Sequence, residues 1–460
     1  MAVSRVAIVN EVARLKRSLR STDETGLLQR PIIVSVIIPT FLRSEYELTG
    51  YRFEVIRNEL LELRPLLERG IIDELIIVDG SVGMRGKIDD RLMRRITLVA
   101  YQSLPLFRDQ VDLVRKYPLI MNLAKMGLWE FAIRIIHQHD PEIGRIGKKL
   151  QILPRELPGG KGAGMWLATG ISAGDVIVYM DSDIRNFESW QVAAMIKPIL
   201  TGWQRQEGCE HIKAYYTRLA VNIDSPEKGF YKLGGRVTRL FVIPLVRVLS
   251  RHGVLSGLEK LKYPLSGEMA TTRDFIAGLE FPVNYSVELG LLLQIWERRL
   301  IEKMDQVDLH IYQHFPRDEE YVKKMVEEVI RLLLVELKPY LKFDESIVNE
   351  YINEAFREIR ATQAQYGKAK VLSDLFLETR RRFFKDIKGD ERRALTHAKI
   401  LKEKISSASE AEEVKKLPAW RQILESQYGQ SFASFIRRRS TISTLELLRK
   451  EGLVKTTMFP

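Results

Sequence analysis

Two aspartates follow the most strand-like segment of the sequence. Residues 176–180 read Val-Ile-Val-Tyr-Met, and Asp181-Ser182-Asp183 come directly after them. A short β-branched run of this kind is typical of a buried parallel strand, and ligands in open α/β sheets bind at the carboxyl ends of such strands. Buried carboxylates need a compensating charge. Because carboxylate oxygens suit hard cations that also bind diphosphate, the pattern indicates a Mg²⁺ or Mn²⁺ site.

A lysine flanked by glycines precedes these aspartates. Lys161 lies in the segment 159–162, Gly-Gly-Lys-Gly, ahead of a helical pattern. An Asp-x-Asp segment by itself is more often a solvated turn with two acidic caps, because short motifs carry a high risk of chance matches. The preceding strand and the lysine segment favour a binding site over that alternative.

The elements around these residues predict a doubly wound α/β sheet. Strands are expected over 34–38 and 75–78, with a third candidate over 96–101, and a helix is expected over 48–69. Alternating strands and helices are typical of a parallel sheet covered on both faces. Pro39-Thr40 and Asp79 follow the first two strands. We therefore expect them to meet the Asp181–Asp183 segment in one crevice, as a nucleotide site requires.

The organisation outside this sheet is predicted to be helical. Residues 104–150 interrupt the alternation and are interpreted as an inserted helical pair with a helix over 121–137. Residues 1–30 are interpreted as a basic amphipathic helix and linker, and residues 31–318 as the α/β domain. From residue 319 to 460 the chain is highly charged, with apolar residues at helical spacing. That part is predicted to form a C-terminal helical bundle.

A second glycine-containing segment could bind an anion. It reads Gly234-Gly235-Arg236-Val237-Thr238. Glycines allow the backbone to approach a ligand closely, and the planar fork of arginine donors suits a carboxylate or a phosphate. The alternative, which this segment alone leaves open, is a turn with a solvated arginine.

Two further residues have a structural and a functional interpretation. Glu288 lies among apolar residues at the start of a predicted helix. A carboxylate in such surroundings needs a partner. The alternative is that it is an ordinary acidic residue at a helix N-terminus, where negative charge is favourable. His314 follows a short predicted strand over 307–313, so it could face the crevice, although a lone histidine is usually structural.

Composition narrows the class of protein. The 460 residues carry a net charge of +12, with 72 basic and 60 acidic side chains interspersed, so we expect a basic surface and no nucleic-acid partner. The single cysteine, Cys209, excludes a disulfide framework and favours the cytoplasm. No apolar run approaches the ~20 residues of a membrane span. The arginine triplets at 380–382 and 437–439 are interpreted as solvated faces.

The order of the motifs resembles that of glucosyl-3-phosphoglycerate synthase and related retaining GT-A glycosyltransferases. The matching segments are VSVIIPT, IIVDGS, GKGAGMW, GDVIVYMDSDI, GGRVTRL, YPLSGEMA, NYSVELG and VDLHIYQH. The resemblance covers residues 34–317 and is interrupted at 104–150. It implies a GT-A fold, a UDP- or GDP-hexose donor and a divalent metal, Mg²⁺ or Mn²⁺.

The resemblance also implies roles for individual residues. The implied donor site consists of Pro39, Thr40, Glu45, Asp79, Lys161, Asp181, Ser182, Leu265, Gly267, Tyr285 and Glu288. The implied metal site consists of Asp183 as direct ligand, His314 and Asp181, and the implied catalytic residues are Glu288 and Asp183. The implied acceptor site consists of Gly235, Arg236, Val237 and Thr238. Tyr312 and Pro316 depart from the family at acceptor-side positions, where relatives carry an arginine and an asparagine.

These expectations combine into one hypothesis with alternatives. The chain is predicted to be a metal-dependent retaining transferase that moves a hexose, with glucose as first expectation, to a small anionic acceptor such as 3-phosphoglycerate, as in compatible-solute synthesis. Glycerate, a sugar phosphate or a glycan remain alternative acceptors, and a homodimer is considered. The competing functions are a sugar nucleotidyltransferase and a basic scaffold built on an inactive transferase core.

Overall fold

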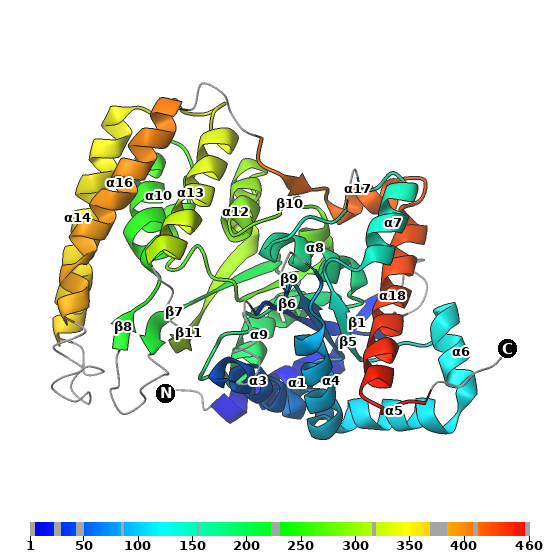
Figure 1. The fold of residues 1–460 in the computed structure, drawn as a ribbon. Coiled ribbons are helices and arrows are strands. Elements are labelled where there is room, and N and C mark those ends of the chain that lie inside the picture. Colours follow the sequence, from blue (N-terminus) through cyan, green and yellow to red (C-terminus); the bar gives the residue numbers. More distant parts are fainter. Residues whose placement is uncertain are drawn as a thin grey trace.

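The computed structural model describes residues 5–22, 29–42, 50–83, 87–153, 156–221, 231–314, 319–368, 384–407 and 413–455. Within them, eight strands form one mixed sheet in the order β11-β7-β9-β6-β3-β4-β5, with β8 paired to β7. Figure 1 shows this sheet inside a shell of helices. The strands are β3 (Val34–Thr40), β4 (Glu74–Asp79), β5 (Ile133–His137), β6 (Val176–Tyr179), β7 (His211–Val221), β8 (Tyr231–Leu233), β9 (Met269–Thr272) and β11 (Met304–His314).

Helices cover both faces of the sheet and both of its ends. Those in the first half of the chain are α1 (Arg5–Ser18), α3 (Tyr51–Glu68), α4 (Arg91–Ser103), α5 (Pro105–Lys116), α6 (Pro118–Met126), α7 (Pro141–Lys149), α8 (Lys161–Ile171) and α9 (Ser189–Arg205). The later ones are α10 (Ile243–Arg251), α11 (Arg273–Ala277), α12 (Val287–Glu297), α13 (Glu319–Glu336), α14 (Glu345–Lys368), α16 (Asp390–Ser407), α17 (Trp420–Glu425) and α18 (Gly429–Lys450). Small antiparallel pairs join β1 (Arg20–Thr22) to β2 (Gln29–Pro31) and β10 (Phe281–Pro282) to β12 (Lys416–Leu417).

Strand direction determines which residues share an edge of the sheet. β3 runs parallel to β4 and β6, β4 runs parallel to β5, and β11 runs parallel to β7. β9 is antiparallel to both β6 and β7, so that β7 and β11 point in the same direction as β6. The carboxyl ends of β3, β4, β5, β6, β7 and β11 therefore lie along one edge. The predicted doubly wound α/β fold is confirmed, with β9 as an antiparallel strand that the sequence did not predict.

Two hydrophobic cores lie on opposite faces of the central strands. Along β3, Ile37 belongs to one core, with α8 and α12, whereas Val36 and Ile38 belong to the other, with α3 and α9. Successive side chains of a strand point to opposite faces, so a strand covered on both faces must be apolar throughout. This requirement explains the uninterrupted Val and Ile runs of β3, β4 and β6.

Two elements between residues 91 and 137 differ from the prediction. The strand candidate over 96–101 is part of helix α4. The helix predicted over 121–137 ends at Met126, because Gly127 adopts a left-handed conformation (φ 78°) that closes α6. The β-branched residues Ile133–His137 then form β5, which is buried and pairs with β4. The stretch 104–150 thus contributes an edge strand in addition to helices.

The helices after residue 319 fall into two groups. α13, α14 and α16 pack together and against α10, at one end of the molecule. α18 instead packs on β5, α4 and α8, at the opposite end (Figure 1). The predicted single bundle is therefore divided, because the apolar face of α18, with Phe432 and Leu448, covers the edge strand β5. The domain boundaries at 30 and 318 stay predictions.

The arginine triplet in α18 is not a solvated face. Arg437 pairs with Glu130 at 2.7 Å, and Arg439 pairs with Asp140 at 2.8 Å and with Glu446 at 2.7 Å. Glu130 and Asp140 lie just before and just after β5, whereas Glu446 belongs to α18 itself. The other triplet, at 380–382, lies outside the described residues. Among the residues that are described, no helix has the length and apolar character needed to cross a membrane.

Candidate active site

Lys161 lies between two carboxylates at the carboxyl edge of the sheet. Its Nζ is 2.5 Å from Oδ1 of Asp181, which follows β6 closely, and 2.6 Å from Oε1 of Glu288 in the first turn of α12. Glu288 is buried, with 2% of its surface exposed. Glu288 is 127 positions from Lys161 in the sequence, and the fold brings the two together.

Glycines allow the backbone of the lysine segment to approach its neighbours. Gly160 has φ 129°, and a Cβ atom there would lie 2.3 Å from the backbone oxygen of Val283. A Cβ at Gly267 would lie 2.5 Å from both Asp181 Oδ1 and Lys161 Nζ. Gly267 therefore stands directly against the charged cluster, where the resemblance places the donor sugar.

The charges of this cluster stabilise one another. Burial by itself would lower the pKa of Lys161, but Asp181 and Glu288 outweigh this effect and hold that pKa well above the usual value. The lysine is therefore a permanent cation at neutral pH. Among the described residues, Oε2 of Glu288 has no hydrogen-bond partner. A buried carboxylate oxygen without a partner is costly, and it is available to a ligand hydroxyl.

A cavity of about 80 Å³ joins this cluster to the glycine-arginine segment. The predicted residues that line it are Lys161, Asp181, Gly235, Arg236, Val237, Thr238, Leu265, Tyr285, Glu288 and His314. The structure thus places predicted donor, metal and acceptor residues around one space. Arg236 is 7% exposed, and a Cβ at Gly235 (φ 69°) would lie 2.5 Å from the Tyr263 hydroxyl, so the arginine segment is tightly packed.

The ends of β3 and β4 form a neighbouring polar site. Thr40 and Ser81 each donate a hydrogen bond of 2.8 Å to Asp79 Oδ1. Burial raises the pKa of Asp79 to about 7, although these hydrogen bonds oppose the shift. Pro39, Thr40 and Asp79 lie at the same edge as Asp181 but do not line the cavity. Glu45, the remaining predicted contact of this group, lies outside the described residues.

The predicted metal ligands are close to the cavity but do not form a complete metal shell. His314 lines the cavity, at the end of β11, and its backbone pairs with Ile184. Asp183 lies 3.9 Å from the guanidinium of Arg218, and Ser182 is in the turn between the two aspartates. Within the described part of the chain, no three His, Cys, Asp or Glu side chains gather as a metal site.

The structure adds residues that the sequence did not single out. Arg218 of β7 and Tyr263 line the cavity, as do Tyr321 and Met325 of α13. An arginine in the interior of a strand was the available signal for Arg218. Tyr312 is buried and stacks on Tyr216, with ring centroids 4.3 Å apart and planes at 15°. At this position, where the sequence departs from the family, aromatic packing therefore takes the place of the arginine. Pro316, the other departure, lies outside the described residues.

The comparisons with known proteins identify the family. No protein-family model matches the chain. The glucosyl-3-phosphoglycerate synthase of Petrotoga mobilis (strain DSM 10674 / SJ95) is 30% identical over 236 residues, which cover 51% of this chain and 68% of that protein. The chain belongs to the glucosyl-3-phosphoglycerate synthase family. The predicted resemblance is thereby confirmed, and with it the GT-A class of the mixed sheet.

Other members of the glucosyl-3-phosphoglycerate synthase family match a shorter part. The protein of that name from Mycobacterium tuberculosis (strain ATCC 25618 / H37Rv) is 33% identical over 202 residues, or 42% of this chain and 60% of the relative. The chain thus spans about three fifths of the length of this relative. Crystal structures of the Mycobacterium tuberculosis enzyme, one of them in complex with Mn²⁺, UDP-glucose and phosphoglyceric acid, align with a TM-score of 0.46 and 24% identity, over 72% of this chain and 84% of that one.

Proposed function

We propose that this chain is a metal-dependent retaining hexosyltransferase. It moves a hexose, glucose in the first instance, from a nucleotide-diphosphate sugar to a small anionic acceptor of the 3-phosphoglycerate type. The observation that carries the proposal is the single cavity that joins Lys161, Asp181 and Glu288 to Arg236. One end of this cavity offers a carboxylate oxygen for sugar hydroxyls, and the other offers a buried guanidinium for an acceptor anion.

The residues present fit a hard divalent cation. Asp181 and His314 line the cavity, and Asp183 lies two residues beyond Asp181. The protein supplies an incomplete shell, but Mg²⁺ usually takes only one or two carboxylates and completes its coordination with water and substrate phosphates. Asp183 and His314 would hold Mg²⁺ or Mn²⁺, with Asp181 beside them. Bound there, the cation would neutralise the charge of the departing diphosphate.

Glu288 is assigned to the reacting sugar. Its Oε1 is fixed by Lys161 at 2.6 Å, and Oε2 accepts no hydrogen bond from the described residues. Oε2 therefore orients sugar hydroxyls beside the anomeric carbon, and the carboxylate stabilises positive charge that develops on the ring. Lys161 keeps Glu288 in place, because its ammonium group donates to Oε1 of that carboxylate.

Retention at the anomeric carbon follows from attack on the side of the leaving group. The bond from that carbon to the diphosphate oxygen breaks, and the acceptor oxygen bonds to the same carbon from the same face. The proton of the acceptor hydroxyl passes to the departing phosphate oxygen, so charge and atoms balance. Arg236, which is buried against the cavity, holds the acceptor anion in place.

A substrate panel tests the proposal. UDP- and GDP-hexoses are each combined with 3-phosphoglycerate, glycerate and sugar acceptors, with Mg²⁺ or Mn²⁺, and released nucleoside diphosphate is measured. We expect release that requires both an anionic acceptor and the metal. Pyrophosphate in place of nucleoside diphosphate would indicate a nucleotidyltransferase, and no turnover with any pair would contradict the proposal.

The metal role is tested by Asp183→Ala. We expect this variant to lose at least about 100-fold in rate, since even outer-shell partners of a metal cost 10- to 100-fold. The matched control is Asp112→Ala, which removes a half-exposed carboxylate on α5 and should leave the rate unchanged. Activity that survives in Asp183→Ala, or in the wild type after chelation of divalent ions, would refute the metal assignment.

A further inference from the structure

A carboxylate of the chain lies between two arginines next to the cavity. Oε1 of Glu319, at the start of α13, is 3.7 Å from Nη1 of Arg236 and 3.2 Å from Nε of Arg393. Arg236 comes from the glycine-arginine segment and Arg393 from α16. Three parts of the chain, each far from the others in sequence, thus meet around one negative charge.

Arg393 is held in place by two carboxylates. Arg393 is 12% exposed and pairs at 2.8 Å with both Asp386 and Asp390. The buried Asp390 also pairs at 2.7 Å with Arg239, which lies just beyond the segment that holds Arg236. α16 is therefore anchored to the segment that the family resemblance assigns to the acceptor.

The carboxylate of Glu319, in contrast, reaches solvent. Its side chain is 53% exposed, whereas that of Arg236 is 7% exposed. Partly exposed ion pairs contribute little free energy, and a glutamate that reaches solvent can rotate away at small cost. Burial and the charge of Arg393 lower the pKa of Arg236, and Asp386, Glu319 and Asp390 oppose this effect.

We propose that Arg236 and Arg393 form a two-armed site for the anionic group of the acceptor, and that Glu319 occupies it until the acceptor displaces the carboxylate. The ligand class is a phosphate or carboxylate on a small molecule, which guanidinium forks bind well. This inference rests on the proposed function. It adds a specificity residue, Arg393, from the C-terminal helices, and an internal competitor, Glu319.

Binding of anions without turnover tests the site. Inorganic phosphate and 3-phosphoglycerate are titrated into the full-length protein by calorimetry, without donor. Glu319→Gln removes the competing charge, so we expect binding to tighten by about two- to fivefold, the size of effect expected from a partly exposed pair. Its control is Glu320→Gln, whose carboxylate is 70% exposed and 3.7 Å from Lys323. This control should bind like the wild type.

Removal of the second arm should have the opposite effect. Arg393→Gln is expected to weaken phosphate binding by about tenfold or more, since it takes away a largely buried cation. Arg392→Gln, one residue earlier on the exposed side of α16, is its control and should have no effect. Arg393 also supports folding, so each variant is first checked by circular dichroism and thermal unfolding.

The outcomes separate this inference from the proposed function. Unchanged affinity in Glu319→Gln would overturn it, and that variant decides alone if Arg393→Gln does not fold. Equal affinity in Arg393→Gln and Arg392→Gln would overturn it as well. If anions bind as expected but no sugar is transferred, the site stands and the transferase proposal fails. If sugar is transferred but these variants do not change anion binding, the transferase proposal stands and the proposed anion site is refuted.

Discussion

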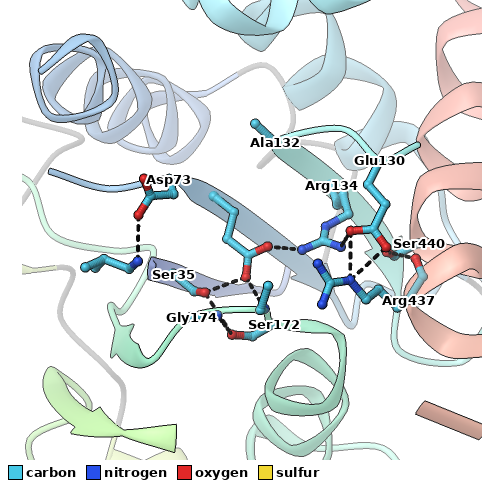
Figure 2. A network of polar contacts seen from close by, with 12 residues as sticks. Ser35, Asp73, Glu130, Ala132, Arg134, Ser172, Gly174, Arg437 and Ser440 are labelled. Carbon is cyan, nitrogen blue, oxygen red and sulfur yellow. Dashed lines mark hydrogen bonds and ion pairs between the residues drawn. The ribbon is translucent and has the colours of Figure 1, made fainter. Parts of the chain in front are cut away.

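Buried charges lie at both edges of the central sheet, and the two sets differ in how fully they are paired. At the amino edge, Arg134 of β5 pairs with Glu74 of β4 and, at 3.0 Å, with Glu130, and Arg437 of α18 pairs with Glu130 at 2.7 Å (Figure 2). Carboxylates and guanidinium groups alternate there. At the carboxyl edge, Lys161 alone lies between Asp181 and Glu288.

The surroundings of the two sets also differ in how completely they pair the buried charges. Ser35 and the backbone of Ala173 also donate to Glu74. Burial would raise the pKa of Glu74, but Arg134, these two hydrogen bonds and Arg437 together lower it. The carboxyl-edge set faces a cavity, and Glu288 keeps an oxygen without a hydrogen-bond partner among the described residues. Within the amino-edge set, only Nε of Arg134 lacks a partner among the described residues. A nearly complete network that faces no cavity favours stability, whereas incomplete pairing beside a cavity favours a functional site.

Breaking the amino-edge network should have the largest effect. Arg134→Met leaves Glu74 buried without its main cation, so we expect the free energy of unfolding to fall by about 3–5 kcal/mol. The measurement is denaturant unfolding. Arg145→Met, which removes a 62% exposed partner of Glu142, should leave the free energy of unfolding almost unchanged. If the free energy of unfolding falls equally in the two variants, burial of the network contributes nothing to stability.

Changing the carboxyl-edge set should instead affect turnover. Glu288→Gln keeps the shape but removes the charge, and Lys161 retains Asp181 as a partner at 2.5 Å. We expect kcat to fall by about 100-fold and the free energy of unfolding to change by less than about 2 kcal/mol. Steady-state kinetics and denaturant unfolding measure both. An effect confined to KM for the donor would contradict the role of Glu288 at the reacting carbon.

Asp79, also at the carboxyl edge, should have a smaller effect on stability, and this effect should depend on pH. Its pKa is raised to about 7 by burial, against about 4 in the unfolded chain. The folded state therefore binds more protons between these values, and stability falls as the pH rises from ~4 to ~7. The slope for one such group is at most about 1.4 kcal/mol per pH unit. Asp79→Asn should flatten the fall measured from pH 5 to 7, and an unchanged slope would exclude Asp79 as its source.

The sequence could predict the carboxyl edge because its geometry follows from topology. Lys161 begins α8, Asp181 follows β6 and His314 ends β11, and all three line one cavity. Glu288 was recognised because a carboxylate among apolar residues needs a partner, which Lys161 provides.

The other parts of the fold and of the site depended on packing partners that local sequence patterns do not specify. β5 was assigned to a helix because its isoleucines fit both periodicities, and only pairing with β4 decides between them. Arg437 was interpreted as solvated because nothing near it in sequence reveals Glu130. Arg393 belongs to helices outside the family resemblance, so its position beside Arg236 could come only from the structure.

The most direct test is a crystal structure with UDP and Mn²⁺, in which the anomalous signal of manganese locates the metal. The account predicts one manganese site bound by Asp183 and His314, with the diphosphate beside Lys161. Manganese or nucleotide bound away from the carboxyl edge of the sheet, or an edge that stays empty at saturating UDP and Mn²⁺, would contradict it.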